Sequence, residues 1–114
     1  MSHYLLQAAY TPEALQVLVH NPQDRTAALQ APIEKLGGRI QSLFLSFGDY
    51  DAVAILELPD NVSAAAIAIA ISAGGACKNV KTTPLLTGAE AVDAAKKAAA
   101  SGYRSLVASA RAAG

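Results

Sequence analysis

A short polar turn between two apolar runs most constrains how this chain can fold. The turn is Phe47-Gly48-Asp49-Tyr50-Asp51, and it separates the apolar residues 40–47 from the apolar residues 52–58. Glycine and aspartate are typical turn residues, and apolar runs of this length are typical of strands. The sequence therefore predicts a β-hairpin whose strands cover residues 39–47 and 51–58.

The chain before the hairpin predicts a strand and then helix. In residues 3–10 every even position is apolar or aromatic, which is the alternation of a strand. Thr11-Pro12-Glu13 combines a capping hydroxyl, a proline suited to the first turn and an acid that favours the helix dipole. A short helix is expected from there. A second helix is expected from Asn21-Pro22 to residue 36, kinked or broken at Pro32 because proline lacks an amide donor.

The chain after the hairpin predicts a helix, a strand and an alanine-rich extension. Pro59-Asp60-Asn61 ends the third strand and caps a helix over residues 62–73, although the Ala-Ile alternation there also fits a strand. As a helix it is apolar nearly all round, so the side of Ile69 needs cover. Val92, Tyr103, Leu106 and Val107 are candidates for that cover. Further elements are expected as a strand at residues 80–86 and helices at 89–100 and 103–112.

This order of elements predicts an α+β fold, the ferredoxin-like βαββαβ plait with an extra C-terminal helix. Residues 1–87 are assigned to one domain, and residues 88–114 to an Ala-rich C-terminal helical extension. In the plait the first and third strands are central and antiparallel, and the helices cover the face with the cleanest apolar pattern. The opposite, open face then carries His3, Leu5, Gln7, Asp51, Val53, Ile55 and Glu57.

Leu5, Val53 and Ile55 form an apolar stripe on this open face, and no element of the chain is left to cover it. The chain is 53% hydrophobic and only 16% charged, whereas about 25% of the residues are charged in an average domain. We therefore expect the sheet to pack against a second copy, as a homodimer or higher homo-oligomer, and to enclose the polar residues in a cavity. The alternative is a solvated face with three exposed aliphatic side chains.

Composition excludes several classes of partner. Nine basic and nine acidic residues cancel, and no Lys/Arg cluster occurs, so neither nucleic acid nor an anionic membrane is expected. The single Cys77 excludes an internal disulfide and suits a reducing compartment. Residues 1–20 lack the pattern of a signal peptide, and no apolar run has the length of a membrane span. A cytoplasmic protein is expected.

Several separated motifs resemble the GYD domain, a family named for a Gly, a Tyr and an Asp at the turn after the second strand. The resemblance covers residues 3 to about 86. It is carried by Tyr4, Tyr10, Arg25, Leu36-Gly37-Gly38, Phe47-Gly48-Asp49-Tyr50-Asp51, Glu57-Leu58-Pro59-Asp60 and Val80-Lys81-Thr82. It implies a dimeric α+β barrel type of fold and a homodimer, and it implies no generally established activity. The tail from Gly88 lies outside the resemblance.

The residues of the turn have two interpretations. In the structural one, Gly48 supplies a positive φ or a close backbone approach, and Asp49 or Asp51 accepts hydrogen bonds from turn amides. In the functional one, Tyr50 donates a hydrogen bond to a ligand at the mouth of a cavity, and Asp51 orients that ligand or takes a proton.

His3 and Glu57 are a second pair of candidates. Antiparallel pairing brings the start of the first strand near the end of the third, and both side chains face the open side. An imidazole held by a carboxylate is a suitable general base. The alternative is a surface histidine beside a glutamate that caps the following turn.

Arg25 and Gln7 complete the ligand-binding candidates. Arg25 is expected to pair with Asp49 or Asp51, or to bind an anionic ligand. Two histidines without close ligand partners do not form a metal-binding pattern, so neither a metal nor a cofactor is expected. Cys77 has no neighbouring histidine to activate it.

Three functions follow. The leading hypothesis is a small homo-oligomeric protein that binds a small molecule between its sheet and a partner subunit. The second is a cofactor-free enzyme, such as a monooxygenase or isomerase of the dimeric α+β barrel type, with His3, Glu57, Tyr50 and Asp51 as catalytic candidates. The third is a purely structural subunit whose tail docks onto other chains.

Overall fold

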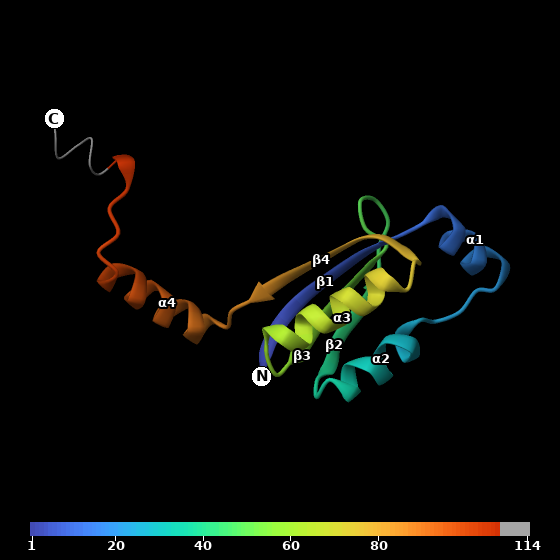
Figure 1. The fold of residues 1–114 in the computed structure, drawn as a ribbon, viewed down its shortest axis with the longest axis horizontal. Helices are drawn as coiled ribbons and strands as arrows, with labels where there is room; N and C mark the ends of the chain where they lie inside the picture. The colour runs from blue at the N-terminus through green and yellow to red at the C-terminus, as the bar shows by residue number, and fades with distance from the viewer. Residues whose placement is uncertain (108–114) are drawn as a thin grey trace.

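One antiparallel sheet with helices on one of its faces forms the body of the molecule (Figure 1). The computed structural model describes residues 1–107. The elements are β1 (Ser2–Tyr10), α1 (Pro12–His20), α2 (Thr26–Lys35), β2 (Arg39–Leu45), β3 (Ala52–Leu58), α3 (Asn61–Ala73), β4 (Cys77–Leu85) and α4 (Gly88–Ala100). The four strands lie in the order β2-β3-β1-β4, and each neighbouring pair is antiparallel. The predicted α+β, ferredoxin-like arrangement is confirmed, with β1 and β3 in the centre.

The hydrophobic core lies between the sheet and helices α2 and α3. In β1 and β3 the even-numbered residues face the helices, and Tyr4, Leu56 and Leu58 are at most 2% exposed. Ile33 of α2 and Ile67 of α3 complete this core from the other side. The apolar alternation of the two strands therefore decides which face of the sheet the helices cover.

Polar caps set where the helices begin. The Thr11 hydroxyl accepts a hydrogen bond from the Ala14 amide at 3.1 Å, and the Asp60 carboxylate accepts one from the Ser63 amide at 2.8 Å. The Ala-Ile run that follows Asp60 is therefore the helix α3 and not a strand. Such caps satisfy amides that the first turn of a helix leaves without partners.

Helix α2 begins later than predicted, and it is not broken at Pro32. It begins at Thr26 and not at Asn21-Pro22, because the Asp24 carboxylate binds the Thr26 amide at 2.9 Å and the Thr26 hydroxyl at 2.6 Å. It also continues through Pro32 to Lys35. A proline removes one backbone hydrogen bond from a helix, and here the next residue, Ile33, is fully buried and fixes the last turns against the sheet.

The C-terminal extension does not cover α3, so that prediction is wrong. Figure 1 shows α4 extending away from the body, beyond the end of β4. Ile69 of α3 stays 68% exposed, and its expected cover is also exposed: Val92 54%, Tyr103 83%, Leu106 86% and Val107 61%. The chain leaves β4 in the direction of the strand, and α4 starts at once at the capping residue Thr87. Half of the helix expected at residues 103–112 lies outside the described residues.

Candidate functional site

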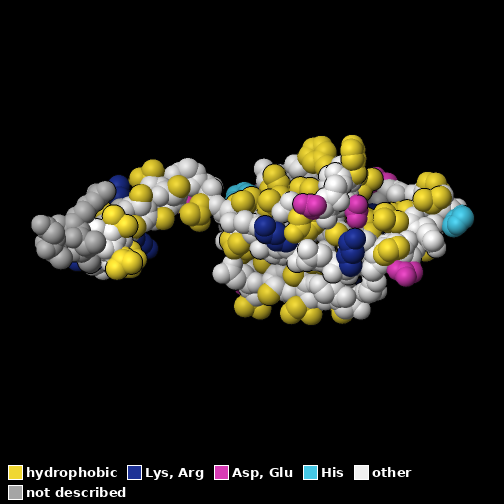
Figure 2. Space-filling view, turned by 90° about the horizontal axis from the view of Figure 1, so that it is seen from above, with side chains coloured by type: hydrophobic (Ala, Val, Ile, Leu, Met, Phe, Trp, Pro, Cys, Tyr) yellow, Lys and Arg dark blue, Asp and Glu magenta, His cyan; other side chains and the backbone are white. Residues whose placement is uncertain are grey.

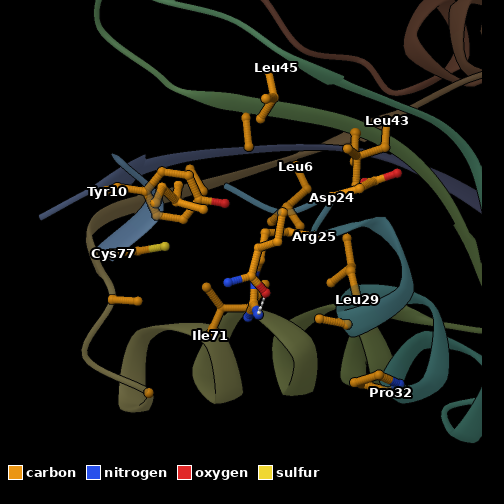
Figure 3. Close-up of a pocket in the computed structure, with 18 of the residues that line it drawn as sticks. Leu6, Tyr10, Asp24, Arg25, Leu29, Pro32, Leu43, Leu45, Ile71 and Cys77 are labelled. Atoms are coloured by element: carbon orange, nitrogen blue, oxygen red, sulfur yellow. Dashed lines mark hydrogen bonds between the residues drawn. The ribbon is translucent and has the colours of Figure 1, made fainter. Parts of the chain in front are cut away.

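A cavity of about 780 Å³ lies on the helical side of the sheet, between the strands, α2 and α3 (Figure 3). Small side chains leave this space open. Ala8, Ala52 and Ala54 of the central strands form its floor, and Ala28 of α2 and Ala70 of α3 form part of its walls. Larger apolar side chains close the sides: Leu6, Leu29, Leu43, Leu45, Ile67 and Ile71. Alanines at facing positions therefore leave a cavity in a place that larger side chains would have filled.

Polar groups line this cavity from two places, the pair of strands β1 and β4 and the loop before α2. Tyr10, Cys77 and Arg25 all contribute to the lining. Burial is the main cause that raises the pKa of the Tyr10 phenol, with the Cys77 and Asp51 charges adding to it and Arg25 opposing it. Burial, and then Asp51, raise the pKa of the Cys77 thiol. Both groups are therefore protonated at neutral pH, so Tyr10 is a hydrogen-bond donor and Cys77 is a poor nucleophile.

Arg25 lies on the loop before α2 and reaches toward α3 near Ile71 (Figure 3). Its guanidinium donates a hydrogen bond of 3.4 Å to the side-chain oxygen of Gln23. The expected ion pair with Asp49 or Asp51 is not formed among residues 1–107. The reason is that the Asp51 carboxylate is held elsewhere, by the backbone of β1.

The turn after β2 serves the sheet and not the cavity. Gly48 has the predicted positive φ, +127°, and no atom lies within 4 Å of where a Cβ would stand, so conformation alone requires glycine here. Asp51 Oδ2 accepts the Tyr10 amide at 2.8 Å, at the bulge of β1, and the Asp51 amide donates to the Ala8 carbonyl at 2.9 Å. The expected bond to a turn amide is therefore replaced by a bond to another strand. Asp49 is exposed.

Tyr50 and Asp51 do not line the cavity. Tyr50 is half-buried, and its carbonyl accepts a hydrogen bond from the Ser46 hydroxyl at 2.8 Å. The cavity mouth that the sequence predicted beside Tyr50 belongs to a cavity formed with a partner subunit, and it stays a prediction. Gln7 also lies elsewhere, on the open face opposite Val53 and Lys81.

His3 and Glu57 stand directly opposite each other in the β1–β3 register, as the sequence indicated. His3 Nε2 lies 3.2 Å from Glu57 Oε1, and Arg39 binds the other oxygen of the same carboxylate. Hydrogen bonding by Arg39 is the main cause that lowers the pKa of Glu57. This carboxylate does not cap the following turn, because Asp60 does so. The cluster lies on the open face and does not line the cavity.

The sequence predicted a cavity between the open face and a partner subunit, which stays a prediction, whereas the cavity within this chain lies on the helical face. Sequence reasoning took the clean apolar face as core and missed Tyr10, Cys77 and the alanines as lining residues. The signal was present, because small residues recur at facing positions of β1 and β3, close to Tyr10. Arg25 is the one predicted ligand-binding residue that does line the cavity.

The described chain contains no obvious metal centre. Among residues 1–107, no three His, Cys, Asp or Glu side chains come together in a way that could hold an ion. Within the same residues, no helix has the length and apolar character needed to cross a membrane.

Comparison with known proteins gives one match. A family model described as the GYD domain matches residues 4–95, which include the sheet, α1 to α3 and the first part of α4. Neither the curated proteins nor the solved structures contain a match to the chain.

Proposed function

This chain belongs to the GYD domain family, and we propose that it binds a small, largely apolar molecule in the cavity between the sheet, α2 and α3. The observation that supports the proposal is the cavity itself. Its volume of about 780 Å³ falls within the roughly 300–1,000 Å³ of typical small-molecule sites. Its lining is mainly aliphatic, with a few polar groups, which is the usual composition of such sites.

We also propose that the chain associates with copies of itself through the open face of the sheet. Leu5, Val53 and Ile55 are only half-buried there, and Phe44 on the neighbouring strand is 68% exposed. A homodimer or higher homo-oligomer formed in this way removes that apolar surface from water. The ligand cavity does not depend on this contact, because it lies on the other side of the sheet. The free thiol of Cys77 supports a reducing compartment such as the cytoplasm.

Cavity-filling variants test ligand binding with a neutral, environment-sensitive dye such as Nile red. Ala70→Trp places an indole in the cavity wall, whereas Ala65→Trp places one on an exposed part of the same helix that does not line the cavity. We expect the wild type and Ala65→Trp to bind the dye with the same affinity, and Ala70→Trp to bind at least about tenfold more weakly. Circular dichroism checks that both variants keep the fold. Equal affinity in the two variants, or no binding by the wild type, contradicts the proposal.

The His3–Glu57 contact favours a second candidate function, that of a cofactor-free enzyme of the monooxygenase or isomerase type. The carboxylate holds the imidazole in place for proton transfer. Arg39 shares the same carboxylate and weakens its pull on the imidazole. This candidate requires a substrate on the open face, so the position of a bound molecule separates it from the leading proposal.

A further inference from the structure

We infer that the ligand of this cavity is an anionic amphiphile, a molecule with a carboxylate at one end and an apolar body, and that Arg25 binds the carboxylate. The inference rests on the proposed ligand-binding function. It adds a chemical class to that function, because the largely aliphatic lining of the cavity includes the guanidinium of Arg25.

Arg25 is the only basic residue among those that line the cavity. Within residues 1–107 its guanidinium has no carboxylate partner, and its one hydrogen bond, to neutral Gln23, is long at 3.4 Å. A guanidinium has five N–H donors, and because Arg25 is exposed, most of them are open to solvent or to a ligand. A carboxylate matches their geometry best, because it accepts two parallel hydrogen bonds.

The nearby acids do not take the place of such a ligand. Asp24 lines the cavity, but its Oδ1 is bound to the amide and hydroxyl of Thr26, and Figure 3 shows it on the side of Leu43. Asp51 lies behind Tyr10, outside the lining, and its Oδ2 accepts the Tyr10 amide. Both carboxylates are thus stabilised by backbone donors, whereas the charge of Arg25 is not paired.

Tyr10 supplies a second donor to the same cavity. Figure 3 shows its hydroxyl directed into the cavity, and the Arg25 charge acts on this phenol. The two donors belong to different elements, the end of β1 and the loop before α2. Leu6 and Leu29 line other parts of the cavity, where an alkyl or aromatic body is removed from water.

Three probes with the same alkyl chain test the inference: octanoate, octanol and octylammonium. Their affinities are measured by calorimetry for the wild type, for Arg25→Gln and for Lys35→Gln. The last variant removes one positive charge from the end of α2, outside the cavity lining. A charge-assisted hydrogen bond predicts that the wild type binds octanoate about tenfold more tightly than octanol. We expect Arg25→Gln to lose this preference and Lys35→Gln to keep it.

Other results contradict the inference in distinguishable ways. If octanol or octylammonium binds the wild type as tightly as octanoate, or if Arg25→Gln retains the preference for octanoate, the anionic class is wrong while the cavity remains a binding site. If octanoate does not bind although Nile red does, the class is again wrong. If neither the octyl probes nor Nile red binds, the proposed function fails together with the inference.

Discussion

At the scale of single residues, the turn at residues 47–51 depends on a backbone shape and on a long-range hydrogen bond. Gly48 adopts a φ of +127° that side chains disfavour. Asp51 connects the start of β3 to the bulge at the end of β1 through the Tyr10 amide. Asp49, between them, is exposed and has no comparable contact. The turn therefore contains one carboxylate that stabilises the sheet and one that does not.

Replacing each carboxylate in turn tests this division. Asp51→Ala leaves the Tyr10 amide without its charged acceptor, so we expect it to lower the free energy of unfolding by about 1–2 kcal/mol. Asp49→Ala is the matched control, with an expected change below about 0.5 kcal/mol. Urea denaturation followed by circular dichroism measures both. Equal losses in the two variants contradict the structural role of Asp51.

The positive φ of Gly48 could be predicted from the sequence, because glycine between two strands is a local signal. The partner of Asp51 could not, because Tyr10 lies 41 residues away along the chain and its amide donates this hydrogen bond at a bulge of β1. The His3–Glu57 contact was predictable for a different reason: antiparallel pairing of the central strands fixes which residues stand opposite each other.

At the scale of elements, capping residues set where each helix begins, but packing determines what each helix contributes. Asp60 caps α3, which packs in the core through Ala64 and Ile67. Thr87 and Glu90 form a complete capping box at the start of α4, with bonds of 3.2 and 3.0 Å. Figure 2 shows the arm that contains α4 separate from the body. The stability of α4 is therefore expected to depend on contacts within the helix and not on packing against the body.

Removing the two caps separates local from global stability. Asp60→Ala is expected to lower the free energy of unfolding of the whole domain by about 1 kcal/mol, because a lost cap costs this much in a packed helix. Thr87→Ala is expected to reduce helix content over residues 88–100, seen in backbone chemical shifts, without moving the unfolding midpoint of the sheet. A short isolated helix is marginal in water, which makes it sensitive to its cap. A global loss in Thr87→Ala equal to that in Asp60→Ala would show that α4 packs on the body.

Sequence patterns predicted all four strands and helices α1, α3 and α4 within a few residues, because alternation and caps are local properties. They did not predict the direction of α4 or the absence of cover over Ile69. Alanine-rich sequence favours a helix without indicating which surface that helix contacts. The start of α2 was also misplaced, since Asp24 acts on Thr26 and not on the residues after Pro22.

At the scale of the whole molecule, the sheet presents two faces with different expected occupants. Helices cover one face and leave the cavity, while the other retains half-buried Leu5, Val53 and Ile55. The sequence indicated the uncovered face, because no predicted element of the chain is left to cover it. It could not indicate the cavity, because an apolar face of alanines and leucines has the same pattern whether its volume is filled or hollow.

Native mass spectrometry at micromolar concentration tests self-association. We expect a homodimer or higher homo-oligomer for the wild type, and mainly monomer for Ile55→Glu, because a charge on the central strand opposes burial of the open face. Ile69→Glu, on the exposed side of α3, is the control and should keep the assembly. A variant that ends at residue 87 tests the alternative in which the tail docks onto other chains. An unchanged assembly of this variant argues against a role of the tail. A monomeric wild type contradicts self-association itself.

The most direct test of ligand binding is an NMR titration that observes the isoleucine methyl groups while neutral octanol is added. Ile67 and Ile71 line the cavity, Ile55 lies on the open face, and Ile69 faces solvent. Binding between the sheet, α2 and α3 predicts saturable shifts of the Ile67 and Ile71 methyl signals, with Ile55 and Ile69 unchanged. Shifts confined to Ile55 would place the ligand on the open face, and no saturable shift at Ile67 or Ile71 would contradict a binding site in this cavity.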